Sequence, residues 1–141
     1  MSKPDFVLDA RLDADTRLVA SLALCDVRLM NDVRYAWLVL VPRRTGLVEV
    51  TDLPVDEQVL LWQEVNRAST ALRAVAPCDK LNLGALGNIV RQLHVHIVAR
   101  CAGDAAWPGP VWGHGSAQPY AEASLSAWLG ALRLALESAS G

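Results

Sequence analysis

Short apolar stretches alternate with polar turns along this chain, and several of them have the two-residue period of a β-strand. Residues 24–32, LCDVRLMND, alternate between apolar and polar positions, and Asn31 with Asp32 is typical of a turn. Residues 37–42, WLVLVP, form a continuous apolar run that Pro42 ends, which predicts a buried strand. The two segments together predict a hairpin. Two further strands are predicted for residues 79–85, DKLNLGA, and residues 92–100, QLHVHIVAR.

Two longer segments have the spacing of an amphipathic helix. In residues 51–77, Pro54 suits the first turn, Asp56 and Glu57 complement the positive end of the helix dipole, and Pro77 marks the end. The apolar positions of this segment are Leu61, Val65, Ala68, Leu72 and Val75. The second segment, about residues 121–138, carries Leu125, Trp128, Leu129, Leu132 and Leu136.

Residues 101–119, between the last predicted strand and the last predicted helix, are rich in Gly, Pro and Trp and predict a loop. At 141 residues the chain is long enough for one domain with its own core, so we expect a single domain over residues 1–141. Hairpin strands combined with two helices predict an α+β fold, with a mainly antiparallel sheet and helices packed on one face.

Composition and charge exclude several classes of protein. Hydrophobic residues make up 52% of the chain and charged residues 20%, which disfavours disorder. The formal net charge is −2 and no basic block is present, so general nucleic-acid binding is not expected. We expect neither a membrane span nor a signal peptide, because no long apolar run is present. The three scattered cysteines, Cys25, Cys78 and Cys101, suit reduced thiols and predict a cytoplasmic protein.

The candidate chemistry lies in residues 82–100, NLGALGNIVRQLHVHIVAR, which contain two of the three histidines. On a strand, Gln92, His94 and His96 share one face, and the intervening Leu93, Val95 and Ile97 take the other. We expect the apolar set to face the core helices and the polar set to face outward. Upstream, Gly84 and Gly87 allow backbone N–H groups to approach an anion closely, and Asn82 and Asn88 add amide donors. The combination predicts a phosphate held beside an imidazole.

Less specific interpretations of the same residues stay open. Two histidines on one face of a strand are often ordinary residues at the solvent edge. They also have the spacing of a metal-binding element, although a metal site needs a third ligand and no Cys or carboxylate is close in sequence. The glycines alone can form a simple β-turn. The functional interpretation depends on the loop and both histidines occurring in order within 19 residues.

This stretch resembles the signature of the histidine triad (HIT) superfamily, in which a glycine-rich loop precedes alternating histidines and apolar residues. The motif here is Gln92-Leu93-His94-Val95-His96-Ile97-Val98. Two further segments are similar to family elements: WLVLVPRR resembles an earlier apolar strand ending in Pro and basic residues, and AWPGPVWG resembles the Trp-Pro element of the nucleoside phosphoramidase branch. The resemblance covers about residues 22–113 and leaves out the terminal helix.

The resemblance implies an α+β fold, a homodimer and attack on a nucleotide α-phosphorus, with no cofactor. The substrate it implies is a purine nucleotide or dinucleotide, cleaved by a phosphoramidase or a dinucleoside polyphosphate hydrolase. His94 would be the nucleophile that carries a covalent nucleotidyl intermediate, and His96 would contact phosphate oxygens or help protonate the leaving group. By the same resemblance, a further set of residues would contact the substrate: Asn82, Gly87 and Asn88 the phosphate, Asn31 the ribose, and Trp107 the pocket wall.

The chain also departs from the family pattern. The first triad position is Gln92, which hydrogen-bonds but cannot titrate, and Trp37 stands where the family has a further histidine. Asn88 and Ile89 replace the usual Gln and Ser or Thr beside the phosphate. His114 is interpreted as a solvated loop residue. The leading hypothesis is therefore a HIT-type hydrolase with low turnover, the alternative is a nucleotide-binding module without useful catalysis, and a third is a small metal protein using His94 and His96.

Overall fold

The computed structural model describes residues 5–139 and confirms the α+β class. Its centre is a five-stranded antiparallel sheet in the order β1-β2-β3-β5-β4. The strands are β1 (Thr16–Ser21), β2 (Cys25–Met30), β3 (Ala36–Pro42), β4 (Lys80–Gly84) and β5 (Val95–Arg100). The predicted hairpin is β2 with β3, and β5 pairs with both β3 and β4.

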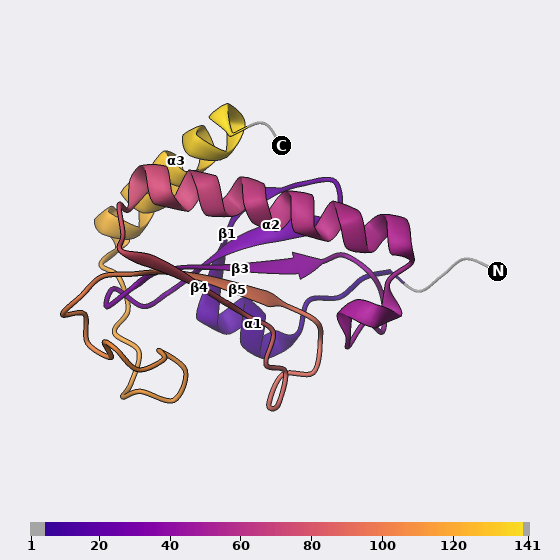
Figure 1. The fold of residues 1–141 in the computed structure, drawn as a ribbon, viewed down its shortest axis with the longest axis horizontal. Coiled ribbons are helices and arrows are strands. Elements are labelled where there is room, and N and C mark those ends of the chain that lie inside the picture. Colours follow the sequence, from indigo (N-terminus) through magenta and orange to yellow (C-terminus); the bar gives the residue numbers. More distant parts are fainter. Residues whose placement is uncertain (1–4, 140–141) are drawn as a thin grey trace.

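Helices cover the sheet unequally on its two sides (Figure 1). The long helix α2 (Val55–Val75) and the terminal helix α3 (Glu122–Ser138) pack on one face, as the periodicity predicts. The short helix α1 (Ala10–Asp15) lies on the opposite side, and a 3-10 turn, η1 (Val50–Asp52), precedes α2. None of the helices in residues 5–139 is long and apolar enough to cross a bilayer.

The main core lies between the sheet and the two long helices. Four of the five predicted apolar positions of α2 are buried, namely Leu61, Val65, Ala68 and Leu72. The same helix buries Glu64, whose carboxylate accepts hydrogen bonds from the backbone N–H groups of Leu24 and Cys25 at 2.9 and 2.8 Å. The carboxylate thereby joins α2 to the start of β2, because those two N–H groups would otherwise be buried without partners.

A second, smaller core lies on the other face of the sheet and corrects one expectation. The polar side of the segment predicted as a strand, residues 92–100, does not face solvent: His94 and His96 are 7% and 6% exposed. The α1 helix and the loop after β5 cover this face. Leu12 of α1 and Ala106 and Val111 of the loop pack against residues of the sheet and the turn before β3, namely Tyr35, Trp37, Val39, Val41 and Val98. The predicted alternation of faces holds, but both faces are buried.

The element bounds differ from prediction in two places. Strand β5 begins at Val95, so Gln92 and His94 belong to the preceding loop, whereas the pattern predicted a strand from residue 92. The backbone N–H of Leu93 is bonded to the carbonyl of Leu47 at 2.9 Å, which holds this loop outside the sheet pairing. Helix α1 and strand β1, each six residues long, were not predicted. The three cysteines are free thiols.

Candidate active site

The two histidines open onto a cavity of about 770 Å³ on the side of the sheet away from α2. Its walls come from α1, the end of β2, the glycine loop before β5 and the loop that contains Trp112 and His114. This volume lies within the range of roughly 300–1,000 Å³ that small-molecule sites occupy. Four segments far apart in the sequence therefore enclose one site large enough for a nucleotide.

His94 is held by the backbone two residues before it. Its Nδ1 lies 2.7 Å from the carbonyl oxygen of Gln92. Because a carbonyl oxygen can only accept a hydrogen bond, Nδ1 carries a proton, so in the neutral ring it is Nε2 that has the free lone pair. The ring is fixed in the tautomer that a nucleophilic imidazole requires.

His96 is held in the opposite tautomer by Trp37, at the position where the family has a further histidine. The indole N–H of Trp37 donates to Nδ1 of His96 at 3.0 Å, so the proton of neutral His96 is on Nε2. Burial, and secondarily the neighbouring His94, lowers the pKa of His96 from its ordinary 6.5 to about 3. The resemblance gave His96 two alternative roles, contact with phosphate oxygens or protonation of the leaving group, and in this environment the ring is neutral with a hydrogen-bond donor at Nε2.

The two imidazoles lie against each other and against a wall of indole rings. The centroids of His94 and His96 are 4.8 Å apart in an edge-to-face arrangement. Trp112 contacts His96 from the cavity side, with centroids 5.5 Å apart. Trp112 therefore packs against the ring of His96 in addition to the hydrogen bond from Trp37.

Three of the predicted substrate contacts line the cavity. Gly87 has a φ of +68°, a conformation that favours glycine, and Asn88 follows it. Asn31 lines the wall formed by the end of β2, and its side-chain oxygen accepts from the backbone N–H of Tyr120 at 2.9 Å. With the oxygen engaged there, the amide NH₂ group of Asn31 is the end left to contact a ligand.

Two other predicted contacts, Asn82 and Trp107, lie outside the cavity walls. Both contact the buried guanidinium of Arg100: the side-chain oxygen of Asn82 accepts from it at 2.8 Å, and the ring of Trp107 lies 5.7 Å from it. Asp104 completes this cluster with two hydrogen bonds to Arg100 at 2.8 and 2.9 Å. The cluster joins β4, β5 and the following loop, which is why these two side chains are directed away from the site.

The Gln92 side chain also has structural partners. Its Oε1 accepts from the backbone N–H of Asp9 at 2.8 Å, and its Nε2 donates to the carbonyl of Val7 at 2.8 Å. The side chain of Gln92 therefore contacts the N-terminal segment, and the backbone carbonyl of Gln92 contacts His94.

Sequence reasoning missed several residues of the cavity wall. Arg11 and Asp15 come from the unpredicted α1, and Arg34 from the turn after β2. His114 is exposed, as expected, and nevertheless lines the cavity with Trp112. The Trp-Pro resemblance indicated the right loop but favoured Trp107 over Trp112. Within residues 5–139 no three His, Cys, Asp or Glu side chains are grouped so that they could hold a metal ion.

Comparisons with known proteins agree with this geometry. The sequence matches the HIT domain family over residues 11–103. A histidine triad protein from Sinorhizobium meliloti 1021 is 46% identical, with 90% of this chain and 94% of that chain covered and a TM-score of 0.88. A histidine triad protein from Bradyrhizobium japonicum is 45% identical over 94% and 99% of the two chains, with a TM-score of 0.92.

A third solved structure, a histidine triad protein from Marinobacter aquaeolei VT8, is 42% identical over 97% of this chain and 100% of that chain, with a TM-score of 0.93. A search of the curated proteins returned no match. The family match spans well over half of the chain, and the paired imidazoles belong to the motif that resembles the family signature. The chain therefore belongs to the histidine triad (HIT) family.

Proposed function

We propose that the protein cleaves nucleotides by attack of His94 Nε2 on the α-phosphorus, as a hydrolase of phosphoanhydride or phosphoramidate bonds. The observation that carries the proposal is the 2.7 Å contact between His94 Nδ1 and the Gln92 carbonyl. A neutral imidazole with one nitrogen fixed and the other free is a good nucleophile, and it splits one difficult displacement into two easier ones.

The first step forms the bond between Nε2 and phosphorus and breaks the bond to the leaving group, which departs as a phosphate or nucleotide anion, or as an amine whose nitrogen takes its proton from solvent water. Water then cleaves the nucleotidyl-histidine and regenerates the free imidazole. His96 acts here as a neutral donor, because its Nε2–H can bond a phosphate oxygen without a change of charge. Gly87 and Asn88 are proposed to supply further donors around the same phosphate.

The rest of the cavity suits a nucleoside. Leu86, Ile89 and Val111 give it apolar walls, which suit the faces of a purine. Asn31 is proposed to contact the ribose hydroxyls through its amide. The proposed substrate is therefore a purine nucleotide or dinucleotide.

A trapping experiment tests the proposal. Protein incubated with an α-³²P-labelled dinucleoside polyphosphate or nucleoside phosphoramidate and then denatured at alkaline pH, where the phosphorus–nitrogen bond of a nucleotidyl-histidine is stable, should retain label on His94. His94→Ala should lose the label and lower turnover by several orders of magnitude, yet still bind mononucleotide. His114→Ala, which removes the third histidine, is the matched control and should still be labelled. Near-normal turnover in His94→Ala would contradict the proposed mechanism.

One observation favours a second function, nucleotide binding without useful turnover. Position 92 is not titratable and the pKa of His96 is about 3, so neither can protonate a leaving group as a neutral-range acid. A leaving group that departs as a stabilised anion needs no such acid, whereas an amine does. Tight nucleotide binding with no label on His94 in the same experiment would favour this second function.

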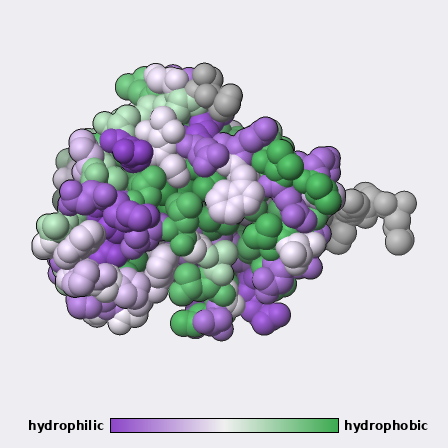
Figure 2. All heavy atoms as spheres, viewed as in Figure 1, coloured by the Kyte–Doolittle hydropathy of each residue, from purple (hydrophilic) through white to green (hydrophobic). Residues whose placement is uncertain are grey.

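We further propose that the protein forms a homodimer through β4 and α2. Strand β4 is at the edge of the sheet and exposes Leu83 at 43%; Leu83 lines one shallow pocket with Trp62 of α2, which is 52% exposed, and Val59 of the same helix is 55% exposed. Figure 2 shows apolar surface in the middle of the face that carries these elements. An open strand edge next to an apolar patch is suited to pairing with a second copy. Light scattering on a sizing column tests this, and a monomer at micromolar concentration would contradict it.

A further inference from the structure

The N-terminal segment, residues 7–15, forms one wall of the cavity. Leu12 of α1 is 4% exposed and packs with Trp37 and Val39 in the smaller core. Arg11 and Asp15 of the same helix line the cavity. A helix of only six residues is not stable alone, so its position depends on tertiary contacts.

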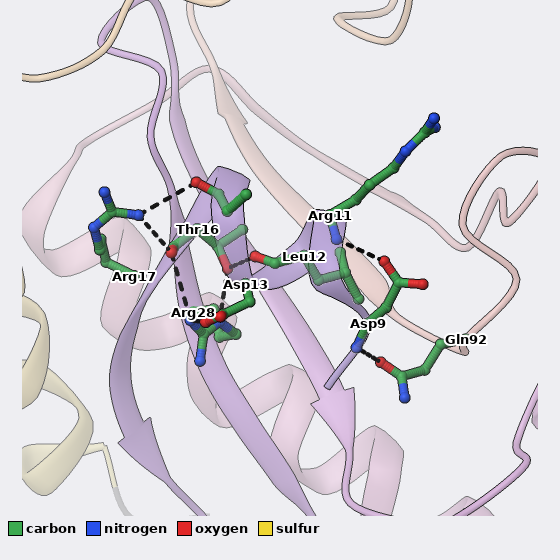
Figure 3. Close-up of polar contacts among 9 residues, drawn as sticks. Asp9, Arg11, Leu12, Asp13, Thr16, Arg17, Arg28 and Gln92 are labelled. Carbon is green, nitrogen blue, oxygen red and sulfur yellow. Dashed lines mark hydrogen bonds and ion pairs between the residues drawn. The ribbon is translucent and has the colours of Figure 1, made fainter. Parts of the chain in front are cut away.

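The segment is fastened at both ends (Figure 3). At its start, Gln92 bonds the N–H of Asp9 and the carbonyl of Val7, and the Asp9 carboxylate caps the helix by accepting from the N–H of Arg11 at 2.8 Å. At its end, Arg28 of β2 donates to the hydroxyl of Thr16 at 2.6 Å.

Glutamine is better suited than the histidine of the family pattern to make the two hydrogen bonds at the start of the N-terminal segment. The Val7 carbonyl and the Asp9 N–H flank Leu8 and both meet the one side chain. A carboxamide offers a donor and an acceptor side by side on one planar group, whereas the two nitrogens of an imidazole point in widely different directions. The same residue orients His94 through its carbonyl, so Gln92 links the proposed nucleophile to the cavity wall.

Arg11 is the cationic side chain of this wall. Within residues 5–139 its guanidinium makes no hydrogen bond or ion pair, and Figure 3 shows it extended away from the helix. The other arginine of the cavity, Arg34, is engaged by both carboxylate oxygens of Asp32 and by the carbonyl of His114. Of the two arginines that line this cavity, Arg11 is therefore the one whose guanidinium remains available to an anionic ligand.

Building on the nucleotide-cleaving function proposed above, we propose that Gln92 is a positioning residue that fastens the N-terminal segment over the cavity, and that Arg11 on this segment binds phosphate groups beyond the α-phosphorus. The favoured substrate class is then a nucleotide with a chain of phosphates, such as a dinucleoside polyphosphate. Such a leaving group also departs as an anion, which suits a site whose His96 is a neutral donor.

Calorimetric affinities for ATP and AMP, measured at low salt without divalent cations on the His94→Ala background, test the role of Arg11. Arg11→Ala should lower the ratio of ATP to AMP affinity about tenfold, since one charge-assisted contact to the outer phosphates is lost. Arg73→Ala removes the same charge from an exposed position on α2 and should leave the ratio unchanged. Arg11→Lys should restore part of the ratio.

Gln92→Met, which keeps the length and removes the amide, tests the positioning role. Gln92→Met should lower the ratio of ATP to AMP affinity. Adding Arg11→Ala to this variant should lower the ratio no further, because the two substitutions remove the same contact between Arg11 and the outer phosphates. A merely structural role for Gln92 would lower both affinities equally, and fully additive effects on the ratio would also overturn positioning. Because Arg11 is exposed, Arg11→Ala should not disturb folding. It therefore tests whether Arg11 contacts the outer phosphates even if Gln92→Met does not fold.

The outcomes for the two proposals are distinct. If the protein binds neither AMP nor ATP, the proposed nucleotide function fails and this inference fails with it. If it binds both, and Arg11→Ala leaves their ratio unchanged, only the inference about the N-terminal segment is overturned.

Discussion

Replacing Trp37 with Phe tests the tautomer of His96 most directly. The indole N–H of Trp37 donates to His96 Nδ1 at 3.0 Å, and both residues are buried, at 7% and 6% exposure. Trp37→Phe keeps an aromatic ring beside His96 and removes the donor. Nδ1 then has no fixed partner, and the two neutral tautomers of His96 become closer in free energy.

The expected size of the effect follows from the burial of this pair. A buried acceptor left without its donor costs about 1–3 kcal/mol. If ~1–2 kcal/mol of this is lost from the donation of Nε2–H to the phosphate in the transition state, turnover falls roughly 5- to 30-fold. We expect KM to change less than kcat, because the contact to the developing charge is weakened more than ground-state binding.

Imidazole ¹⁵N chemical shifts and steady-state kinetics together measure both effects. Native His96 should be neutral with its proton on Nε2 between pH 5 and 8, and Trp37→Phe should give a mixture of tautomers. Trp112→Phe is the matched control, because Trp112 also contacts His96 but its indole N–H is buried without a hydrogen-bond partner in the described structure. That variant should leave the His96 tautomer unchanged. A native His96 with its proton on Nδ1, or titrating near pH 6.5, would refute the reasoning.

Four further predictions follow from individual contacts. Gly87→Val should weaken nucleotide binding about tenfold by calorimetry, since a φ of +68° costs a branched residue ~1–2 kcal/mol, while the fold should persist because an added Cβ meets only the Val90 carbonyl, at 3.6 Å. Glu64→Leu should lower the free energy of unfolding in urea by ~2–4 kcal/mol by stranding two buried N–H groups, and Glu64→Gln should cost less. Gln92→His should raise kcat less than tenfold, because imidazole cannot replace both backbone contacts; a hundredfold gain would contradict this. Unfolded His96 binds a proton near pH 6.5 and the native residue only near pH 3, so acid should lower the free energy of unfolding in this window by up to ~1.4 kcal/mol per pH unit, and His96→Gln should remove that dependence.

The sequence by itself determined most of the architecture. Period and turn chemistry are local properties, and they predicted β2, β3, β4, α2 and α3 close to their observed bounds. They missed α1 and β1, each only six residues long: α1 is held by distant partners in the smaller core around Leu12, whereas β1 pairs with the adjacent β2 but its sequence, TRLVAS, lacks a regular alternation of polar and apolar residues. The start of β5 was predicted three residues early, because the alternation of Gln92 to Ile97 continues into a loop that pairs elsewhere.

The sequence also indicated the two histidines and the glycine loop, because these residues lie within one short segment. Only the tertiary structure decided their chemical states. Trp37 fixes the tautomer of His96 from 59 residues away, and Gln92 bonds backbone groups 83 and 85 residues away. The tertiary structure also places Asn82 and Trp107 in the Arg100 cluster and Arg11 in the wall of the cavity. A sequence pattern specifies which groups a strand or loop presents, whereas protonation, tautomer and pocket membership depend on neighbours that only the packing of distant segments supplies.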